Sequence, residues 1–145
     1  NWSRTVYPFT SSYWFSTQAD SGRAGFSFYF LDTANGTLGD DQMDNLKTYF
    51  QYDLRPKIVF THYPIYSNGS TLFTIQNTLE RDTLLTLFAQ HNVKQVFEGH
   101  AHMSFDFDYS LFKETVVASF LYNRACCLFT MDETTGTVVY KKITF

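Results

Sequence analysis

The histidines of this chain are the residues whose types and spacing indicate chemistry. The chain has four histidines, and three of them follow hydrophobic runs that are typical of β-strands: His62 follows KIVFT, and His100 and His102 follow VKQVFEG. In α/β folds, ligands bind where parallel strands end at their carboxyl edges. Imidazole is also the commonest side-chain metal ligand. The three histidines therefore predict a metal cluster at one edge of a sheet.

A single alanine separates His100 from His102. Residues at positions i and i+2 of an extended chain point the same way, so both imidazoles could serve one cluster. Gly99, directly before them, permits a sharp departure from the strand and a close approach of the backbone to a ligand. His91 is different, because it ends a helical segment where a cation suits the helix dipole. We interpret His91 as a surface residue.

Other chemistries that use an HxH pair fail on the neighbouring residues. A site like that of the metallo-β-lactamases needs HxHxDH, but Ser104 and Phe105 stand at the last two positions. Histidine-triad hydrolases need a third alternating histidine where Ser104 stands, and cupins need a glutamate that MSFDFDYS lacks. Two alternatives to an enzyme stay open at this point. The histidines could form a structural zinc site, or the chain could be a metal-free binding domain.

Composition indicates an ordinary globular domain. The 145 residues are 44% hydrophobic, which suffices for one domain with a sizeable core. The net charge is −3 and no basic cluster exceeds Lys141-Lys142, which argues against a nucleic-acid surface. No apolar run approaches the roughly 20 residues of a membrane span.

Cysteine and asparagine positions say less about function. Cys126 and Cys127 are adjacent, match no metal-ligand spacing and are interpreted as small buried strand residues. Asn1, Asn35 and Asn68 each begin an N-x-S/T triplet, which slightly favours an extracytoplasmic location.

Strands and helices alternate along the middle of the chain. We expect strands over 12–17, 26–32, 57–66, 93–99, 105–110, 113–120, 124–132 and 137–145, and helices within 38–54 and 78–92, with a loop over 68–76. This order predicts a mixed α/β fold, in which strand–helix–strand units feed one sheet with helices on one face.

The two helices show capping signals and apolar faces. Asp40 or Asp41 is expected to cap the first helix, so we interpret the acidic run GDDQMD, including Asp44, as capping and not as metal ligation. Pro56 follows that helix and Asn92 ends the second. The positions expected to face the sheet are Met43, Leu46, Tyr49 and Phe50 in the first helix, and Leu84, Leu85 and Phe88 in the second.

The motif FTHYPIY, followed 38 residues later by GHAH as counted from His62 to His100, resembles the calcineurin-like metallophosphoesterases, which include the purple acid phosphatases. The segments FYFLDTANGTLGDDQMDNLK and RDTLLTLFAQHNVKQVFEGHAH also resemble strand and helix units of that family. The resemblance covers roughly residues 26–105.

This resemblance implies a fold, a reaction and a ligand set. The fold would be the C-terminal part of a two-sheet αββα sandwich. The reaction would be metal-dependent hydrolysis of a phosphate ester, by a phosphatase or phosphodiesterase that uses two ions, such as Zn, Fe or Mn, and a metal-bound hydroxide. His62 and His100 would bind one ion and His102 the other, while Tyr63 could face the substrate.

The earlier motifs of that family, D-x-H or D-x-D, GDxxD and GNH[DE], do not occur in residues 1–145 at the expected places. We therefore expect residues 1–145 to be the C-terminal half of one domain. The partner they would need is the N-terminal half, in the same or a separate chain. Without it, we expect this stretch to be inactive.

Overall fold

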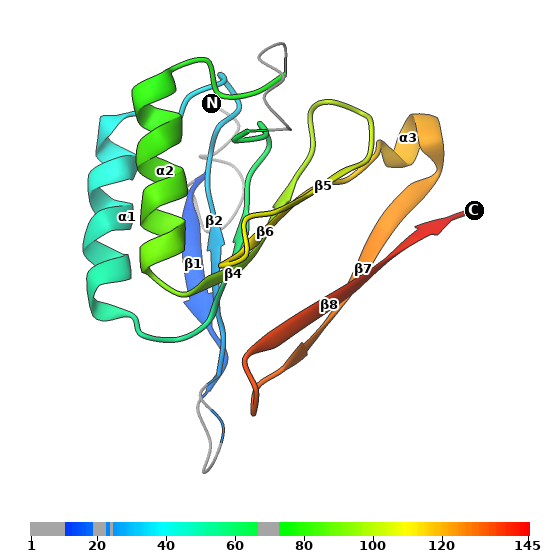
Figure 1. Ribbon diagram of the computed structural model, residues 1–145. Helices are drawn as coiled ribbons and strands as arrows, with labels where there is room; N and C mark the ends of the chain where they lie inside the picture. Colours follow the sequence, from blue (N-terminus) through cyan, green and yellow to red (C-terminus); the bar gives the residue numbers. More distant parts are fainter. Residues whose placement is uncertain (1–10, 19–22, 24, 67–72) are drawn as a thin grey trace.

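The computed structural model describes residues 11–18, 23, 25–66 and 73–145. In this part of the chain, a six-stranded sheet carries two helices on one face and a two-stranded sheet on the other (Figure 1). Two of the N-x-S/T asparagines, Asn1 and Asn68, lie outside the described residues, as does the first part of the loop expected over 68–76.

Four parallel strands form the centre of the large sheet. In spatial order, its strands are β1 (Tyr13–Ser16), β2 (Ser27–Phe30), β3 (Lys57–Phe60), β4 (Val93–Glu98), β6 (Lys113–Val116) and β5 (Phe105–Asp108). Strands β2, β3, β4 and β6 run parallel, whereas β1 and β5 are antiparallel to their neighbours at the two edges. The predicted mixed α/β fold is confirmed.

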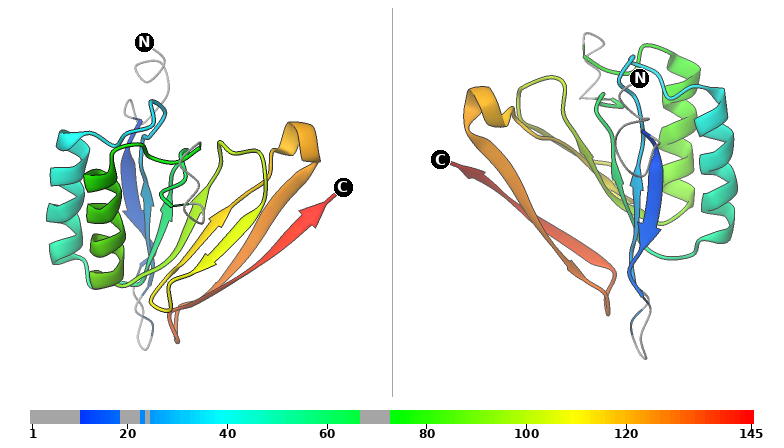
Figure 2. Two further views of the ribbon diagram at one scale, coloured as in Figure 1. Left: turned by 45° about the horizontal axis from the view of Figure 1, so that its top comes forward. Right: turned by 180° about the vertical axis from the view of Figure 1, so that it is seen from behind.

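Helices α1 (Asp40–Tyr52) and α2 (Thr78–Gln90) connect β2 to β3 and β3 to β4. Both cover the same face of the large sheet (Figure 2). They are the crossover connections that parallel strands need. No helix of the described residues is long and apolar enough to cross a bilayer.

The apolar faces of both helices agree with the sequence pattern at most positions. Met43, Leu46, Phe50, Leu84 and Phe88 are buried in the core between the helices and the sheet.

Two positions differ from the expectation. Tyr49 lies at the margin of its helix face, 41% exposed, with its ring 5.6 Å from that of Trp14 on β1. Leu87 is buried where Leu85 was expected, and Leu85 packs at the margin of that core.

The first helix begins differently from the prediction. Its N-cap is Gly39, with a φ of 79° and no side-chain cap, so neither Asp40 nor Asp41 is the capping residue. Both aspartates lie in the first turn, where their charge still favours the positive end of the helix dipole. Asp44 is exposed and pairs with Lys47 at 3.3 Å. The acidic run is thus a feature of the helix terminus, as expected.

The second sheet is the hairpin of β7 (Ala125–Asp132) and β8 (Thr137–Thr144). Phe129 of β7 packs its ring 5.2 Å from Phe97 and 6.0 Å from Phe60, on the face of the large sheet opposite the helices. Asp106 of β5 accepts hydrogen bonds from Tyr140 and from Lys142 (2.6 Å), both on β8. Aromatic packing and one charged network therefore fasten the hairpin to the sheet.

The strand expected over 113–120 is shorter in the structure. Strand β6 ends at Val116, and a helical turn, α3 (Phe120–Asn123), follows. The Ser119 side chain caps this turn by accepting a hydrogen bond from the Tyr122 amide, and Arg124 ends it in the left-handed region with a φ of 49°. Local capping therefore overrides the strand pattern here.

Replacing Phe129 with alanine should loosen the hairpin. The side chain is partly buried against two aromatic rings of the large sheet, so we expect a loss of about 2 kcal/mol in the free energy of unfolding. Leu128→Ala is the matched control, because Leu128 is the preceding residue and is 60% exposed. Urea unfolding gives the energies, and faster amide exchange confined to β7 and β8 would locate the effect. Equal losses for the two variants would contradict this packing.

Candidate metal centre

The predicted histidines follow the carboxyl ends of neighbouring parallel strands. His62 comes after β3, and His100 and His102 come after β4. Backbone hydrogen bonds continue past the ends of both strands: the Thr61 amide donates to the Phe97 carbonyl (3.1 Å), and the Gly99 amide donates to the His62 carbonyl (3.1 Å). The two strand exits are therefore held side by side.

His62 and His100 meet with their imidazole nitrogens facing each other. Nε2 of His62 lies 3.3 Å from Nδ1 of His100. Two imidazole nitrogens on one tetrahedral zinc, each about 2.0–2.1 Å from the ion, lie about 3.3–3.4 Å apart. The separation thus fits two ligands of one ion. It also permits a hydrogen bond between neutral rings, whose direction depends on the tautomer.

His102 does not complete a group of three ligands. Its side chain is exposed, and its ring lies 5.3 Å from that of Tyr122 on α3. Among the described residues, no three His, Cys, Asp or Glu side chains are arranged to hold a metal ion. The described residues therefore supply two converging nitrogens and one nearby histidine.

The backbone that carries His100 and His102 is not extended, contrary to the expectation from their spacing. Both residues adopt a φ of 55°, in the left-handed region, and the Ala101 amide donates to the Gly99 carbonyl across a tight turn (2.6 Å). Such a conformation costs about 1–3 kcal/mol for a residue with a side chain and concentrates at functional sites.

The sharp turn was assigned to Gly99, and this was wrong. Gly99 is not among the residues with positive φ, and a Cβ there would meet His62 at 3.7 Å, an ordinary contact. The histidines themselves make the turn.

Thr33 positions the turn that carries His62. Its buried hydroxyl accepts hydrogen bonds from the amides of His62 (3.2 Å) and Tyr63 (2.8 Å) and lies 2.6 Å from the hydroxyl of Thr61. Thr33 belongs to no motif of the sequence. The only available signal was its place just beyond the strand run FSFYFLD, and one threonine there is unspecific.

Tyr63 supports His100 by stacking. The two ring centroids lie 3.7 Å apart, with 24° between the planes. Tyr63 is half-buried and also packs against the helix-side core. Tyr63 also lies against Gly36, where a Cβ would be 3.5 Å from the ring and where φ is 77°. Tyr63 therefore orients a histidine, whereas contact with a substrate stays a prediction.

Burial favours the neutral form of the His100 ring. Burial, followed by the charges of His62 and His102, lowers its pKa below the usual histidine value. No carboxylate and no Lys or Arg among the described residues contributes to this shift. A neutral imidazole is the form that binds metal.

Two buried carboxyl groups lie beside the strand exits, on β4 and β6. Glu98 accepts a hydrogen bond from the Ile65 amide (3.0 Å), and Glu114 accepts one from the Tyr66 amide (3.0 Å). Both residues are almost inaccessible, at 3% and 2% exposure. Burial, then the charge and hydrogen bonding of Glu114, raise the pKa of Glu98 well above its usual value. These residues hold the chain that follows His62.

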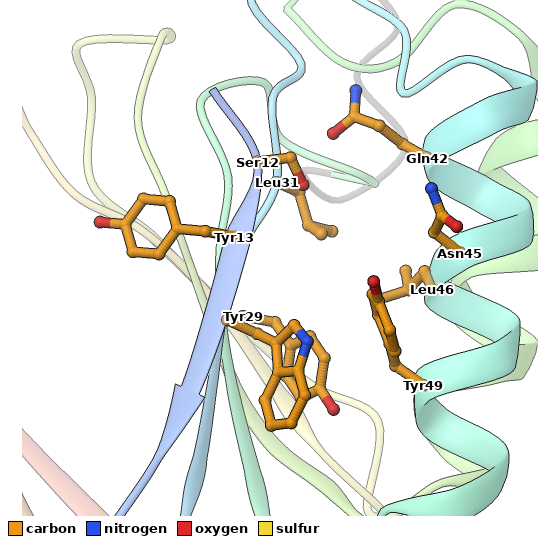
Figure 3. Close-up of a pocket in the computed structure, with 9 residues that line it drawn as sticks. Ser12, Tyr13, Tyr29, Leu31, Gln42, Asn45, Leu46 and Tyr49 are labelled. Atoms are coloured by element: carbon orange, nitrogen blue, oxygen red, sulfur yellow. The ribbon is translucent and has the colours of Figure 1, made fainter. Parts of the chain in front are cut away.

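A separate pocket lies between β1 and α1 (Figure 3). It encloses about 180 Å³ and has aromatic walls from Trp14, Tyr29 and Tyr49, with the amide of Asn45 at its side. None of the three strand-end histidines lines it. Its residues do not include a nucleophile–base pair or a metal-ligand set, so the pocket is not part of the candidate metal centre.

Several solved structures resemble this chain. One is a dimetal phosphatase from Danio rerio, with a TM-score of 0.60, 12% identity, and coverage of 77% of this chain and 50% of that one. Another is GAP50, the anchor in the inner membrane complex of Plasmodium, with a TM-score of 0.56, 17% identity, and coverage of 72% and 36%. No protein-family model matches the chain, and no curated protein matches its sequence.

The comparisons define the class of the fold. At such low identities, the likeness shows that the chain has a partial dimetal-phosphatase-like fold. The resemblance to calcineurin-like metallophosphoesterases is therefore supported at the level of the fold. The chain spans half the length of the phosphatase and 36% of the length of GAP50.

Thr33→Val should release the turn of His62. The variant keeps the shape of the side chain but removes a hydroxyl that accepts hydrogen bonds from two backbone amides. We therefore expect a loss of about 2 kcal/mol in the free energy of unfolding. The NMR signals of His62 and His100 should also shift. Thr130→Val is the control, because Thr130 is exposed on β7. Unchanged stability and histidine signals in Thr33→Val would contradict the assigned role.

Glu98→Gln should flatten the pH dependence of stability. The folded-state pKa of Glu98 is raised above 4.5, so the folded protein binds a proton that the unfolded chain releases. The stability that this proton contributes is therefore fully present below the pKa of Glu98 in the unfolded chain. It is lost as pH rises through the pKa of Glu98 in the folded protein. Urea unfolding from about pH 4 to about pH 8 should show this loss in the wild type and a smaller loss in Glu98→Gln. Parallel curves for the two proteins would contradict the burial of an ionisable Glu98.

Proposed function

We propose that this chain is part of a metal-dependent phosphoester hydrolase. The observation that carries the proposal is the 3.3 Å separation of the His62 and His100 nitrogens, at the carboxyl edge of parallel strands. The fold shared with a dimetal phosphatase supports the same reaction class. The sequence motifs FTHYPIY and GHAH favour it independently.

In this proposal, His62 and His100 hold one ion and His102 contributes to a second. Zinc, iron or manganese suits imidazole ligands, and a pair of such ions activates water and neutralises the phosphoryl oxygens. Thr33 and Tyr63 orient the two ligand histidines. Two cations held close together repel each other and need anionic ligands. Among the described residues, no carboxylate joins the histidines in a group of three that could hold an ion.

The missing ligands would come from a companion segment of the fold, in the same or another chain. An apolar hollow of about 390 Å³ opens between the large sheet and β7, lined by aromatic residues of both sheets. Exposed apolar area of this kind marks an interaction surface. The companion segment would cover this hollow and supply the carboxylates.

Two other functions are compatible with this fold. GAP50 is an anchor in a membrane complex, which favours a binding or scaffold role as the second candidate. A structural zinc site, closed around one ion, is the third.

His100→Ala in the intact protein should weaken zinc or manganese binding by at least about tenfold, because one of two converging nitrogens is lost. Hydrolysis of a generic aryl phosphate should fall with it. His91→Ala is the matched control, since His91 is the C-cap of α2. Calorimetry and metal analysis give affinity and stoichiometry. Equal losses in the two variants would count against the assignment.

Stoichiometry separates the three candidates. Two ions per chain with hydrolysis are expected for the proposed enzyme. One tightly held ion without hydrolysis would instead favour the structural zinc site. A protein that binds no ion, with intact folding, would favour the scaffold.

A further inference from the structure

Aromatic side chains surround the strand-end histidines. Besides Tyr63, stacked on His100, the ring of Phe73 lies 6.1 Å from His100, and that of Tyr122 lies 5.3 Å from His102. We call Tyr63, Phe73 and Tyr122 the aromatic rim. Its members come from the turn after β3, the segment before α2, and helix α3, so three separate parts of the chain converge on one place.

The rim is accessible on the side of α3. Tyr122 is 72% exposed and Phe73 is 39% exposed. Met103, the residue after His102, and Phe120 and Leu121 of α3 are also exposed apolar residues. Helix α3 is nevertheless held firmly, by the Ser119 cap and by the Phe145 amide, which donates to the Arg124 carbonyl (2.9 Å). Apart from Asn123, the exposed side chains of this helical turn are apolar. Exposed apolar side chains grouped beside a polar site are typical of a recognition surface.

Protein cations beside the histidines would also help to bind a phosphate. Among the described residues, no Lys or Arg forms a hydrogen bond, ion pair or ring contact with the three histidines. A phosphate bound there would be held mainly through metal ions, and the remainder of the molecule would meet aromatic rings. Ring faces and edges favour flat, apolar groups, with a preference of about 0.5–1.5 kcal/mol beyond simple area burial.

We infer that the site selects phosphate esters that carry an aromatic or similar apolar group, which packs against Tyr122 and Phe73, over small polar phosphate esters. This inference rests on the proposed function, because the phosphate would be bound at His62 and His100. It adds the substrate class. It also assigns specificity to residues of α3 and of the segment before α2.

The test compares two anions that differ only in the apolar group. Phenylphosphonate and methylphosphonate cannot be hydrolysed at the phosphorus–carbon bond, so binding is measured without turnover. With the intact, zinc-loaded protein, we expect phenylphosphonate to bind about tenfold more tightly by calorimetry. Tyr122→Ala should remove most of this preference, whereas Tyr122→Phe should keep it because the ring remains. Leu111→Ala is the control, since Leu111 is 64% exposed in the β5–β6 turn.

Each outcome has a distinct meaning. Equal affinity of the wild type for the two phosphonates would overturn the inference while leaving the proposed function intact. A preference that survives Tyr122→Ala unchanged would overturn the role of α3, as would a Tyr122 ring that a companion segment already covers in the intact protein. Failure of both phosphonates to bind zinc-loaded protein would overturn the proposed function and, with it, this inference.

Discussion

The parallel pairing of β2, β3, β4 and β6 is the constraint on which the candidate site depends. Parallel strands need a crossover between them, and both helical crossovers return the chain to the same end of the sheet. His62 and His100 therefore emerge side by side although 38 positions separate them in the sequence. Hydrogen bonds beyond the strand ends, such as that from the Gly99 amide to the His62 carbonyl, extend this register into the turns.

At the sheet edge that carries the histidines, residues in unfavourable backbone conformations lie near buried polar side chains. These side chains accept hydrogen bonds from the backbone of the turns. His100 and His102, which are separated by one residue, both occupy the left-handed region of backbone conformation. The buried hydroxyl of Thr33 accepts a hydrogen bond from the His62 amide, and the buried carboxyl of Glu98 accepts one from the Ile65 amide. Glycine would relieve such strain, and strained residues of this kind cluster at functional sites, which supports the proposed role of this edge.

The two faces of the large sheet differ in how completely they are covered. Helices α1 and α2 close one face with a continuous core that includes Phe50 and Phe88. On the other face lies the hairpin β7–β8 (Figure 2). It packs against Phe60 and Phe97 and leaves an apolar hollow beside them. This asymmetry fits a chain that spans only part of the length of its structural neighbours.

The sequence by itself determined the order of the eight strands and the two long helices, the fold class and the strand-end places of His62, His100 and His102, because these follow from hydrophobic periods and local turn residues. Capping competes with those periods over a few residues, which is why Gly39 and helix α3 were missed. Only the tertiary structure decided that Tyr63 stacks on His100 and that the Thr33 hydroxyl accepts a hydrogen bond from the His62 amide. It also decided that the side chains of Glu98 and Glu114 are buried next to each other. These contacts join residues far apart in the chain. They depend on strand order and register, which a pattern of apolar and polar residues leaves open.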